Sequence, residues 1–216
     1  MATFSVIVPT VGRRTLSHTL ASVAAQLEAG DELLVFCNTD GDFGNAARNS
    51  GIERARGSHL VFLDDDDEWL PGALARMRRF ADANPGRVGI FRFRSEFGEL
   101  PVTADLRTAG SPTYVVPNIP GKVGRFGPTD VRAPGFRKPR PGETPESLAE
   151  RFGDYEFIRT TLELRRDEPI WLPQVTTVLR PEKNRWRRLR YRIRLRTRLR
   201  ALTRSSQSSV PGYAGR

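Results

Sequence analysis

The acidic run from Asp64 to Glu68 is the part of this sequence best suited to chemistry. It follows the apolar-rich residues 59–63 (HLVFL) and precedes a second apolar segment that begins at Trp69. Neighbouring like charges repel by about 1 kcal/mol in water, so the run must be either well solvated or neutralised by a cation. Carboxylate oxygens are ligands that Mg²⁺ prefers, with waters and phosphates completing its shell. The run therefore indicates either a divalent-metal site or a solvated acidic turn before a helix.

The elements that would position this run alternate between strand and helix. Four short apolar segments are typical of buried strands, namely residues 4–8, 33–37, 59–63 and 88–93. Three segments between them carry helical patterns, namely residues 15–30, 44–57 and 70–84. This order predicts an α/β fold with a mainly parallel sheet covered by helices on both faces. The acidic run would then lie at the carboxyl end of the third strand, where such sheets bind their ligands.

The second half of the chain has a different composition. Residues 97–145 are dense in Gly and Pro, with one strand expected at residues 113–116. Thr144, Pro145 and Glu146 have the pattern of a helix start, and the helix is expected to reach about Arg166, with Gly153 able to interrupt it. Residues 170–172 and 175–179 are expected as late strands.

The positive charge of the chain is concentrated at its end. Residues 185–216 contain eleven arginines, no lysine and no acid, so subtracting these charges from the net +10 leaves about −1 for residues 1–184. Apolar residues in this tail form no single helical stripe, which favours an extended or disordered arrangement. We expect an anionic membrane surface as the partner of the stretch from Arg185 to Arg204, at roughly 1 kcal/mol per arginine near the surface. Nucleic acid is the less favoured alternative.

The sequence also gives expectations about location. We find no run of roughly 18 apolar residues, which a spanning helix needs, and no secretory signal at the N-terminus. Cys37 is the single cysteine, which fits a reducing compartment. We therefore expect a cytoplasmic protein, peripheral on the inner face of the plasma membrane.

Three segments taken in order resemble a known family. FSVIVPTVGR (residues 4–13), LASVAAQ (20–26) and GNAARNSGIERARGSHLVFLDDDDEW (44–69) resemble the nucleotide-binding half of family 2 glycosyltransferases, which have the GT-A fold. GDYEFIRTTLELRR (153–166) is similar to the family's acidic motif on the acceptor side, and WLPQVTTVLR (171–180) to its late strand. The resemblance implies transfer of a sugar from a nucleotide-diphosphate donor to an acceptor hydroxyl of a surface glycan or glycolipid, with Mg²⁺ or Mn²⁺ and inversion at the anomeric carbon.

The resemblance assigns roles within the acidic run. Asp66 matches the direct metal ligand, and Asp64 would contact the ribose or a metal-bound water. Asp65 occupies the tolerant middle position among the nucleotide-sugar contacts. Asp67 matches an acid that would face the donor sugar or cap the next helix.

Other nucleotide contacts are implied outside the run. Pro9 and Thr10 match the start of the base and ribose contacts. Arg48 and Asn49 match the family's ARN segment, where Arg48 would reach the base or a phosphate, the alternative being a helix-surface arginine. The family usually carries an aspartate directly after the second strand to read the base. Here that role falls to Asp40, with Asp42 as the more distant candidate.

An inverting displacement needs a base that takes the proton of the acceptor hydroxyl. Asp154 matches the acid of the family motif, and its alternative role is an ordinary helix N-cap. Glu156 is the second candidate because this chain has Gly-Asp-Tyr where the family more often has Gly-Glu-Asp.

These assignments divide the chain into three parts. Residues 1–96 would be the nucleotide-sugar-binding half of one GT-A domain, residues 97–184 its acceptor-side half, and residues 185–216 the Arg-rich tail. The main rival is a non-catalytic GT-A-like protein that binds a nucleotide or a partner. A nucleotidyltransferase is less favoured because the first strand is not followed by a Gly-rich loop.

Overall fold

The computed structural model describes residues 1–37, 44–95, 98–101, 104–106, 109–127 and 153–179. All of these belong to one compact unit, Met1–Arg180. The expectations for Asp40, Asp42, the helix start near Pro145 and the Arg-rich tail lie outside the described residues.

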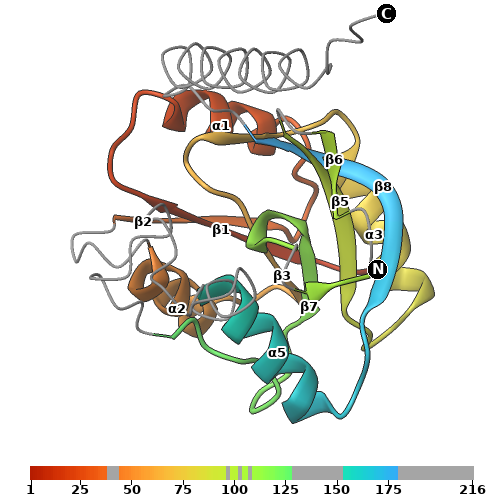
Figure 1. Ribbon diagram of the computed structural model, residues 1–216. Helices are drawn as coiled ribbons and strands as arrows, with labels where there is room; N and C mark the ends of the chain where they lie inside the picture. The colour runs from red at the N-terminus through yellow and green to blue at the C-terminus, as the bar shows by residue number, and fades with distance from the viewer. Residues whose placement is uncertain (38–43, 96–97, 102–103, 107–108, 128–152, 180–216) are drawn as a thin grey trace, which may run out of the picture. The chain divides into compact units, whose positions relative to one another are not determined.

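Helices and strands alternate through the first half of the chain, as the sequence predicts. The order is β1 (Phe4–Thr10), α1 (Leu16–Ala24), β2 (Glu32–Cys37), α2 (Asn45–Arg54), β3 (His59–Phe62), β4 (Asp67–Trp69), α3 (Ala73–Ala83), β5 (Gly89–Ser95), β6 (Gly98–Leu100), the 3-10 helix η2 (Ser111–Thr113), β7 (Tyr114–Pro117), α5 (Gly153–Arg165) and β8 (Ile170–Leu179) (Figure 1). In the part of the chain that the structure describes, no helix is both long and apolar enough to cross a bilayer.

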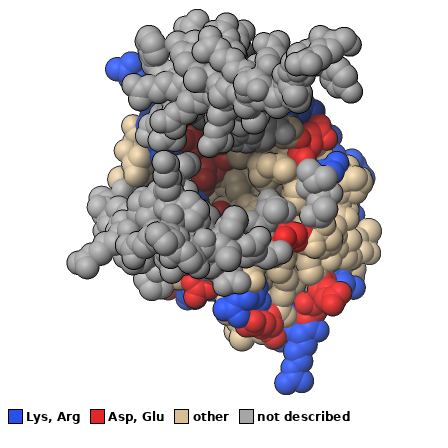
Figure 2. Space-filling view, in the orientation of Figure 1, with Lys and Arg blue, Asp and Glu red and all other residues tan. Residues whose placement is uncertain are grey.

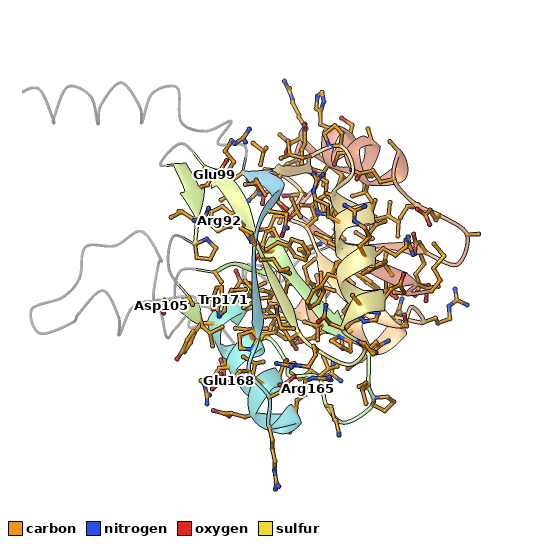
Figure 3. All side chains as sticks on the ribbon, turned by 90° about the vertical axis from the view of Figure 1, so that its right-hand side faces the viewer. Arg92, Glu99, Asp105, Arg165, Glu168 and Trp171 are labelled. Atoms are coloured by element: carbon orange, nitrogen blue, oxygen red, sulfur yellow. The ribbon has the colours of Figure 1, made fainter. Side chains whose placement is uncertain are left out.

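The strands form one curved, mixed sheet in the order β2-β1-β3-β7-β5-β8-β4, and β6 pairs with the last residues of β5, outside this order (Figure 1). Three pairings are parallel, namely β1 with β2 and β3, and β5 with β8. Four pairings are antiparallel. Two of them form where β7 inserts between β3 and β5, and the other two join β4 to β8 and β6 to β5. The α/β class is therefore confirmed, and the sheet is more mixed than the sequence indicates. Arg92 and Glu99 lie across the β5–β6 hairpin with a 4.0 Å ion pair (Figure 3).

Two hydrophobic cores lie on opposite faces of this sheet. Val6 and Val8 of β1 pack into the core beneath α1 and α3, whereas Ile7 packs into the core beneath α2 and α5. Val61 and Phe62 divide between the same two cores. Since successive side chains of a strand point to opposite faces, a strand covered on both sides reads as continuously apolar. The expected helices on both faces are therefore confirmed.

The segment after the acidic run differs from the expected helix start. Residues 67–69 form β4 and pair with β8, and the amide of Leu70 donates to the carbonyl of Thr176 at 2.8 Å. The helix α3 therefore begins at Ala73, after Gly72 at φ 73°, instead of at residue 70. Pairing with a distant strand decides this local conformation, and helical periodicity could not reveal it.

The two expected late strands are one strand with irregular pairing. In β8, Trp171 pairs with Ile90 and Val175 with Arg92, so β8 carries extra residues between these two positions. Pro173 lies in this interval, and a proline has no backbone N–H to donate to a sheet. The break that the sequence suggests is therefore a bulge within β8.

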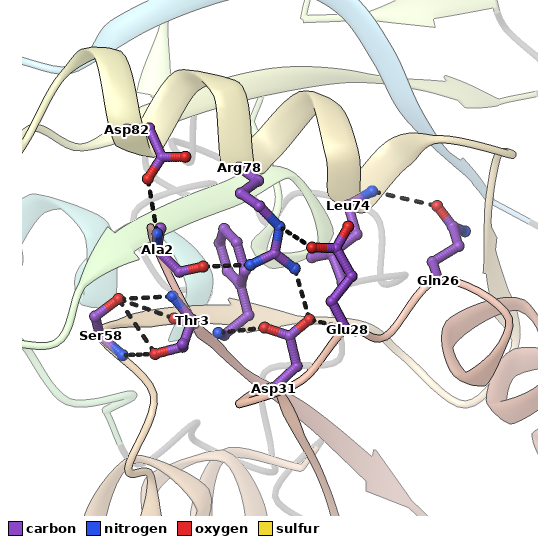
Figure 4. A network of polar contacts seen from close by, with 10 residues as sticks. Ala2, Thr3, Gln26, Glu28, Asp31, Ser58, Leu74, Arg78 and Asp82 are labelled. Atoms are coloured by element: carbon purple, nitrogen blue, oxygen red, sulfur yellow. Dashed lines mark hydrogen bonds and ion pairs between the residues drawn. The ribbon is translucent and has the colours of Figure 1, made fainter.

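A buried polar network fixes α3 to the start of β1. The Arg78 side chain is 6% exposed and donates to the Ala2 carbonyl and to Asp31 Oδ2, the latter at 2.6 Å. Asp31 is fully buried, and its Oδ1 accepts a 2.9 Å hydrogen bond from the amide of Phe4 (Figure 4). Separating α3 from the start of β1 would break this buried ion pair and leave an uncompensated charge. The network therefore anchors the sheet edge opposite the carboxyl ends of β1 and β3.

His59 is a buried histidine with a structural role. Its ring lies 5.7 Å from the ring of Phe4, and its Nδ1 lies 3.0 Å from the Ser58 hydroxyl oxygen. Burial lowers the pKa of His59 to about 4, while the charge of Asp82 opposes this shift and that of Arg165 adds to it. The folded protein therefore holds this ring neutral well below the usual titration range of histidine.

This lowered pKa predicts that the folded protein loses stability as the pH falls from neutral to mildly acidic values. Below about pH 6.5 the unfolded chain binds a proton at His59 that the folded protein excludes. The free energy of unfolding therefore decreases as the pH is lowered. We expect His59 to account for roughly 1 to 2 kcal/mol between pH 7.5 and pH 5, allowing for partial solvent screening. Urea unfolding at both pH values measures this difference in the free energy of unfolding. His59→Gln should reduce the pH dependence, whereas His18→Gln, at an exposed position, should keep it. Equal pH dependence in all three proteins would contradict the assignment.

Candidate functional site

The turn after β1 and the acidic run after β3 meet because these two strands are parallel neighbours. Ile7 pairs with Phe62, and the amide of Leu63 donates to the Ile7 carbonyl at 3.1 Å. The carboxyl ends of both strands therefore lie at the same edge of the sheet. On the face of the molecule in Figure 2, acidic side chains lie in a hollow.

Asp65 joins the two segments. Its Oδ2 accepts hydrogen bonds from the Thr10 hydroxyl at 2.8 Å and from the Val11 amide at 3.1 Å. Its Oδ1 accepts from Arg13 Nη1 at 2.7 Å, and its side chain is only 4% exposed. The structure thus places Asp65 and Thr10 in the scaffold that shapes the site. Their predicted nucleotide contacts stay predictions.

Three other acids converge beside this scaffold. Asp64, Asp66 and Asp67 each offer a carboxylate oxygen within 4.8 Å of the others. An all-carboxylate donor set suits a hard divalent cation such as Mg²⁺ or Mn²⁺, so these residues fit the metal that the sequence predicts. Asp67 belongs to this group because β4 holds it at the sheet edge, where the Thr19 hydroxyl donates to its carbonyl at 2.8 Å.

Arg13 is a site residue that sequence reasoning did not identify. Its Nη1 lies 2.7 Å from Asp65 Oδ1 and 2.7 Å from Asp66 Oδ2. Burial raises the pKa of Asp66, Arg13 opposes this shift, and the charges of Asp64 and Asp65 add to it. The available signal was a basic residue in the turn after the first strand, but only the fold shows which acid it meets.

Arg48 lies inside the site and is not a helix-surface residue. Its side chain is 6% exposed and forms an ion pair with Asp64 Oδ1. Its guanidinium also lies 5.3 Å from the ring centre of Phe126. This placement excludes the surface alternative, and the predicted contact of Arg48 with the base or a phosphate stays a prediction.

Asn49 is engaged by a different part of the protein. Its Nδ2 donates to the Phe126 carbonyl and its Oδ1 accepts from the Phe126 amide, both at 2.9 Å. Both functional groups of the side-chain amide are therefore bound to one backbone residue. Pro9 is buried and packs against Gly44, where an added Cβ would lie 2.9 Å from its ring.

Asp154 lies in the first turn of α5, beside Gly110 and Tyr114. An added Cβ at Gly110 would be 3.9 Å from its Oδ2, and the Tyr114 hydroxyl lies 3.5 Å from its carbonyl oxygen. Burial raises the pKa of Asp154; the charge of Arg48 opposes this shift, and that of Asp64 adds to it. The charges of Arg48 and Asp64 therefore both act on this carboxylate, and burial increases its basicity.

Glu156, the second candidate for the base, is placed differently. It is exposed, and its carboxylate covers Gly127, so closely that a Cβ there would collide with it. Asp154 is the candidate that the charges of Arg48 and Asp64 influence, and the assignment of the catalytic base stays a prediction.

Comparison with known proteins identifies the relatives of this chain. Residues 31–137 match the family model described as Glycosyl transferase family 2. Over 72 residues the chain is 38% identical to GalNAc(5)-diNAcBac-PP-undecaprenol beta-1,3-glucosyltransferase of Campylobacter jejuni, a match that covers 32% of this chain and 23% of that protein.

Solved structures share the fold. S. aureus TarS is similar with a TM-score of 0.55 at 15% identity, covering 82% of this chain and 36% of that chain. The structure of S. aureus TarS 1-349 in complex with UDP-GlcNAc has a TM-score of 0.53 at 16% identity, covering 82% of this chain and 58% of that chain. The GT-A fold expected from the sequence is thereby confirmed. The chain spans less than two thirds of the length of each of these relatives.

Proposed function

This chain belongs to glycosyltransferase family 2, and we propose that it transfers a sugar from a nucleoside-diphosphate donor to an acceptor hydroxyl. The observation that carries this proposal is the convergence of three elements at one sheet edge. The carboxylates of Asp64, Asp66 and Asp67 lie together, Arg48 pairs with the first of them, and the charges of Arg48 and Asp64 act on Asp154 of α5.

Asp66, with Asp64 and Asp67, would hold Mg²⁺ or Mn²⁺. When bound, such an ion supplies positive charge that stabilises a leaving diphosphate. Among the residues that the structure describes, Arg13 and Arg48 are each paired to an acid of the run. We propose that Arg48 keeps Asp64 oriented toward the donor, and that Asp65 holds the turn after β1 in place beneath it.

Asp154 would act as the general base of an inverting displacement. The acceptor oxygen forms a bond to the anomeric carbon while the bond from that carbon to the diphosphate oxygen breaks, and the hydroxyl proton passes to the Asp154 carboxylate. A base with a raised pKa accepts a proton more readily than an ordinary aspartate does. Attack from the face opposite the leaving group inverts the configuration at the anomeric carbon.

We propose a glycan or lipid-linked acceptor for this chain. The name of the Campylobacter jejuni relative describes an undecaprenol-linked acceptor, which supports this choice. The arginines between Arg185 and Arg204 are suited to anionic lipid headgroups. The protein would then work on the inner face of the plasma membrane, where a lipid-linked acceptor would be anchored.

Donor hydrolysis tests the proposed function without knowledge of the acceptor. The wild-type protein is incubated with Mn²⁺ and UDP-, GDP- or dTDP-sugars, because water can replace the acceptor hydroxyl in a slow reaction. We expect release of the nucleoside diphosphate from one of these donors and loss of the reaction in EDTA. Intact donors, together with a thermal shift on nucleotide binding, would instead identify the chain as a binding protein on this scaffold.

A further inference from the structure

Residues 124–127 form a short segment between α2 and α5. The Gly124 amide donates to the Thr161 hydroxyl on α5 at 2.9 Å. On the other side, Asn45 Nδ2 of α2 donates to the Gly127 carbonyl at 2.8 Å, and Asn49 binds the backbone of Phe126 twice. The segment thus links a helix from the donor side of the site to the helix that carries Asp154.

The fit between this segment and α5 leaves no room for side chains at its ends. A Cβ at Gly124 would lie 2.6 Å from the carbonyl oxygen of Phe157, and a Cβ at Gly127 would collide with Glu156. A Cβ at Gly153, the first residue of α5, would meet the Asn45 side chain at 2.6 Å. At Gly124 the backbone of the segment meets the backbone of α5 with no side chain in between, which fixes the separation of the segment from the helix at this point.

The ring of Phe126 carries the contact into α5. It stacks on Phe157 with a centroid distance of 4.3 Å and an interplanar angle of 5°, and meets Phe62 edge to face at 5.1 Å. Its other neighbour is the Arg48 guanidinium, 5.3 Å away. Phe157 follows Asp154 by three residues, so the two side chains lie on the same side of the helix.

We propose that Asn49 is a positioning residue for the base Asp154, acting through Phe126 and Phe157. By holding the backbone of Phe126 with two hydrogen bonds, Asn49 sets where the Phe126 ring stacks. That stacking sets the depth at which the first turn of α5 approaches the acidic run. This inference rests on the proposed function, and it assigns to Asn49 a task other than the nucleotide contact expected from the sequence.

The test separates positioning from general stability. Asn49→Ala removes both hydrogen bonds to Phe126, and Phe126→Leu keeps these backbone bonds but removes the ring stacking. Asn84→Ala is the matched control, since Asn84 Nδ2 also donates to a backbone carbonyl, that of Phe80 at 2.9 Å, at the end of α3. The measurements are kcat and KM for hydrolysis of the donor that the wild type cleaves, nucleotide affinity with Mn²⁺, and amide hydrogen exchange of α5.

We expect Asn49→Ala and Phe126→Leu to lower kcat by about 10- to 100-fold, the size of loss that a small misplacement of a catalytic group produces. Nucleotide affinity should be unchanged, and exchange of the first-turn amides of α5 should accelerate. Asn84→Ala should change neither kcat nor exchange in α5, even if it lowers the melting temperature.

Three results would overturn the inference. The first is an unchanged kcat in Asn49→Ala. The second is a nucleotide affinity that falls in proportion to the rate, which would make Asn49 a donor contact. The third is an equal loss of kcat in Asn84→Ala, which would reduce the effect to stability. If the wild type itself hydrolyses no donor, the proposed function fails, while the hydrogen-exchange comparison still tests the link between Asn49 and α5.

Discussion

Replacing Asp154 with asparagine is expected to stop sugar transfer while donor binding remains intact. Asparagine has nearly the same size, so the packing beside Gly110 and Tyr114 should persist. Its amide cannot accept the proton of the acceptor hydroxyl. Loss of a general base typically costs about 10²- to 10⁴-fold in rate. We expect this loss in kcat, because the donor site formed by the acidic run and Arg48 is unchanged.

The pH dependence of the wild type provides a second measurement. Burial raises the pKa of Asp154, so the base is protonated, and inactive, over a wider acidic range than an ordinary aspartate with a pKa of about 3.9. The rate should therefore rise with pH through a midpoint above that value and then level off. Asp154→Asn should lose this dependence together with the rate.

Glu156→Gln is the matched control for this prediction. Glu156 lies two residues after Asp154 on the same helix, exposed and directed over Gly127. Its substitution should leave the rate close to that of the wild type. A near-wild-type rate in Asp154→Asn, or an inactive Glu156→Gln, would move the base to another residue.

Asp66→Ala should remove metal-dependent nucleotide binding. The three converging carboxylates lie close enough together to repel one another, and the site can hold a diphosphate only if a cation compensates their charge. Removing even an outer partner of a metal ligand costs about 10- to 100-fold in metal affinity, so we expect at least this loss for a direct ligand. Isothermal titration of a nucleoside diphosphate, with Mn²⁺ and again with EDTA, measures the effect.

The expected pattern is specific to the metal. Wild-type affinity should drop in EDTA, whereas Asp66→Ala should bind weakly in both conditions. Asp82→Ala is a suitable control, because Asp82 lies on α3 and accepts a hydrogen bond from the amide of Ala2 at the opposite end of β1. Equal affinity of Asp66→Ala with and without EDTA, at the wild-type level, would show that Asp66 holds no metal.

Local patterns predicted those elements whose conformation depends on their own residues. The buried strands β1 and β3 follow from continuous apolar runs, and α1, α2 and α5 from helical spacing and from glycines near their ends. The position of the acidic run at a strand's carboxyl end follows from the same reading. In contrast, the sequence does not predict β4, because its pairing with β8 joins residues that are about a hundred positions apart.

The sequence by itself therefore determined the α/β class, the family resemblance and the candidate acids, because periodicity, turn residues and short motifs are local properties. The tertiary structure decided which of these acids meet. Asp65 turns inward to Thr10 and Arg13, Asp67 joins Asp64 and Asp66, and Asn49 binds Phe126. These contacts arise from the parallel pairing of β1 with β3, the pairing of β4 with β8, and the approach of residues 124–127 to α2. Long-range packing of this kind leaves no period or spacing in a single sequence.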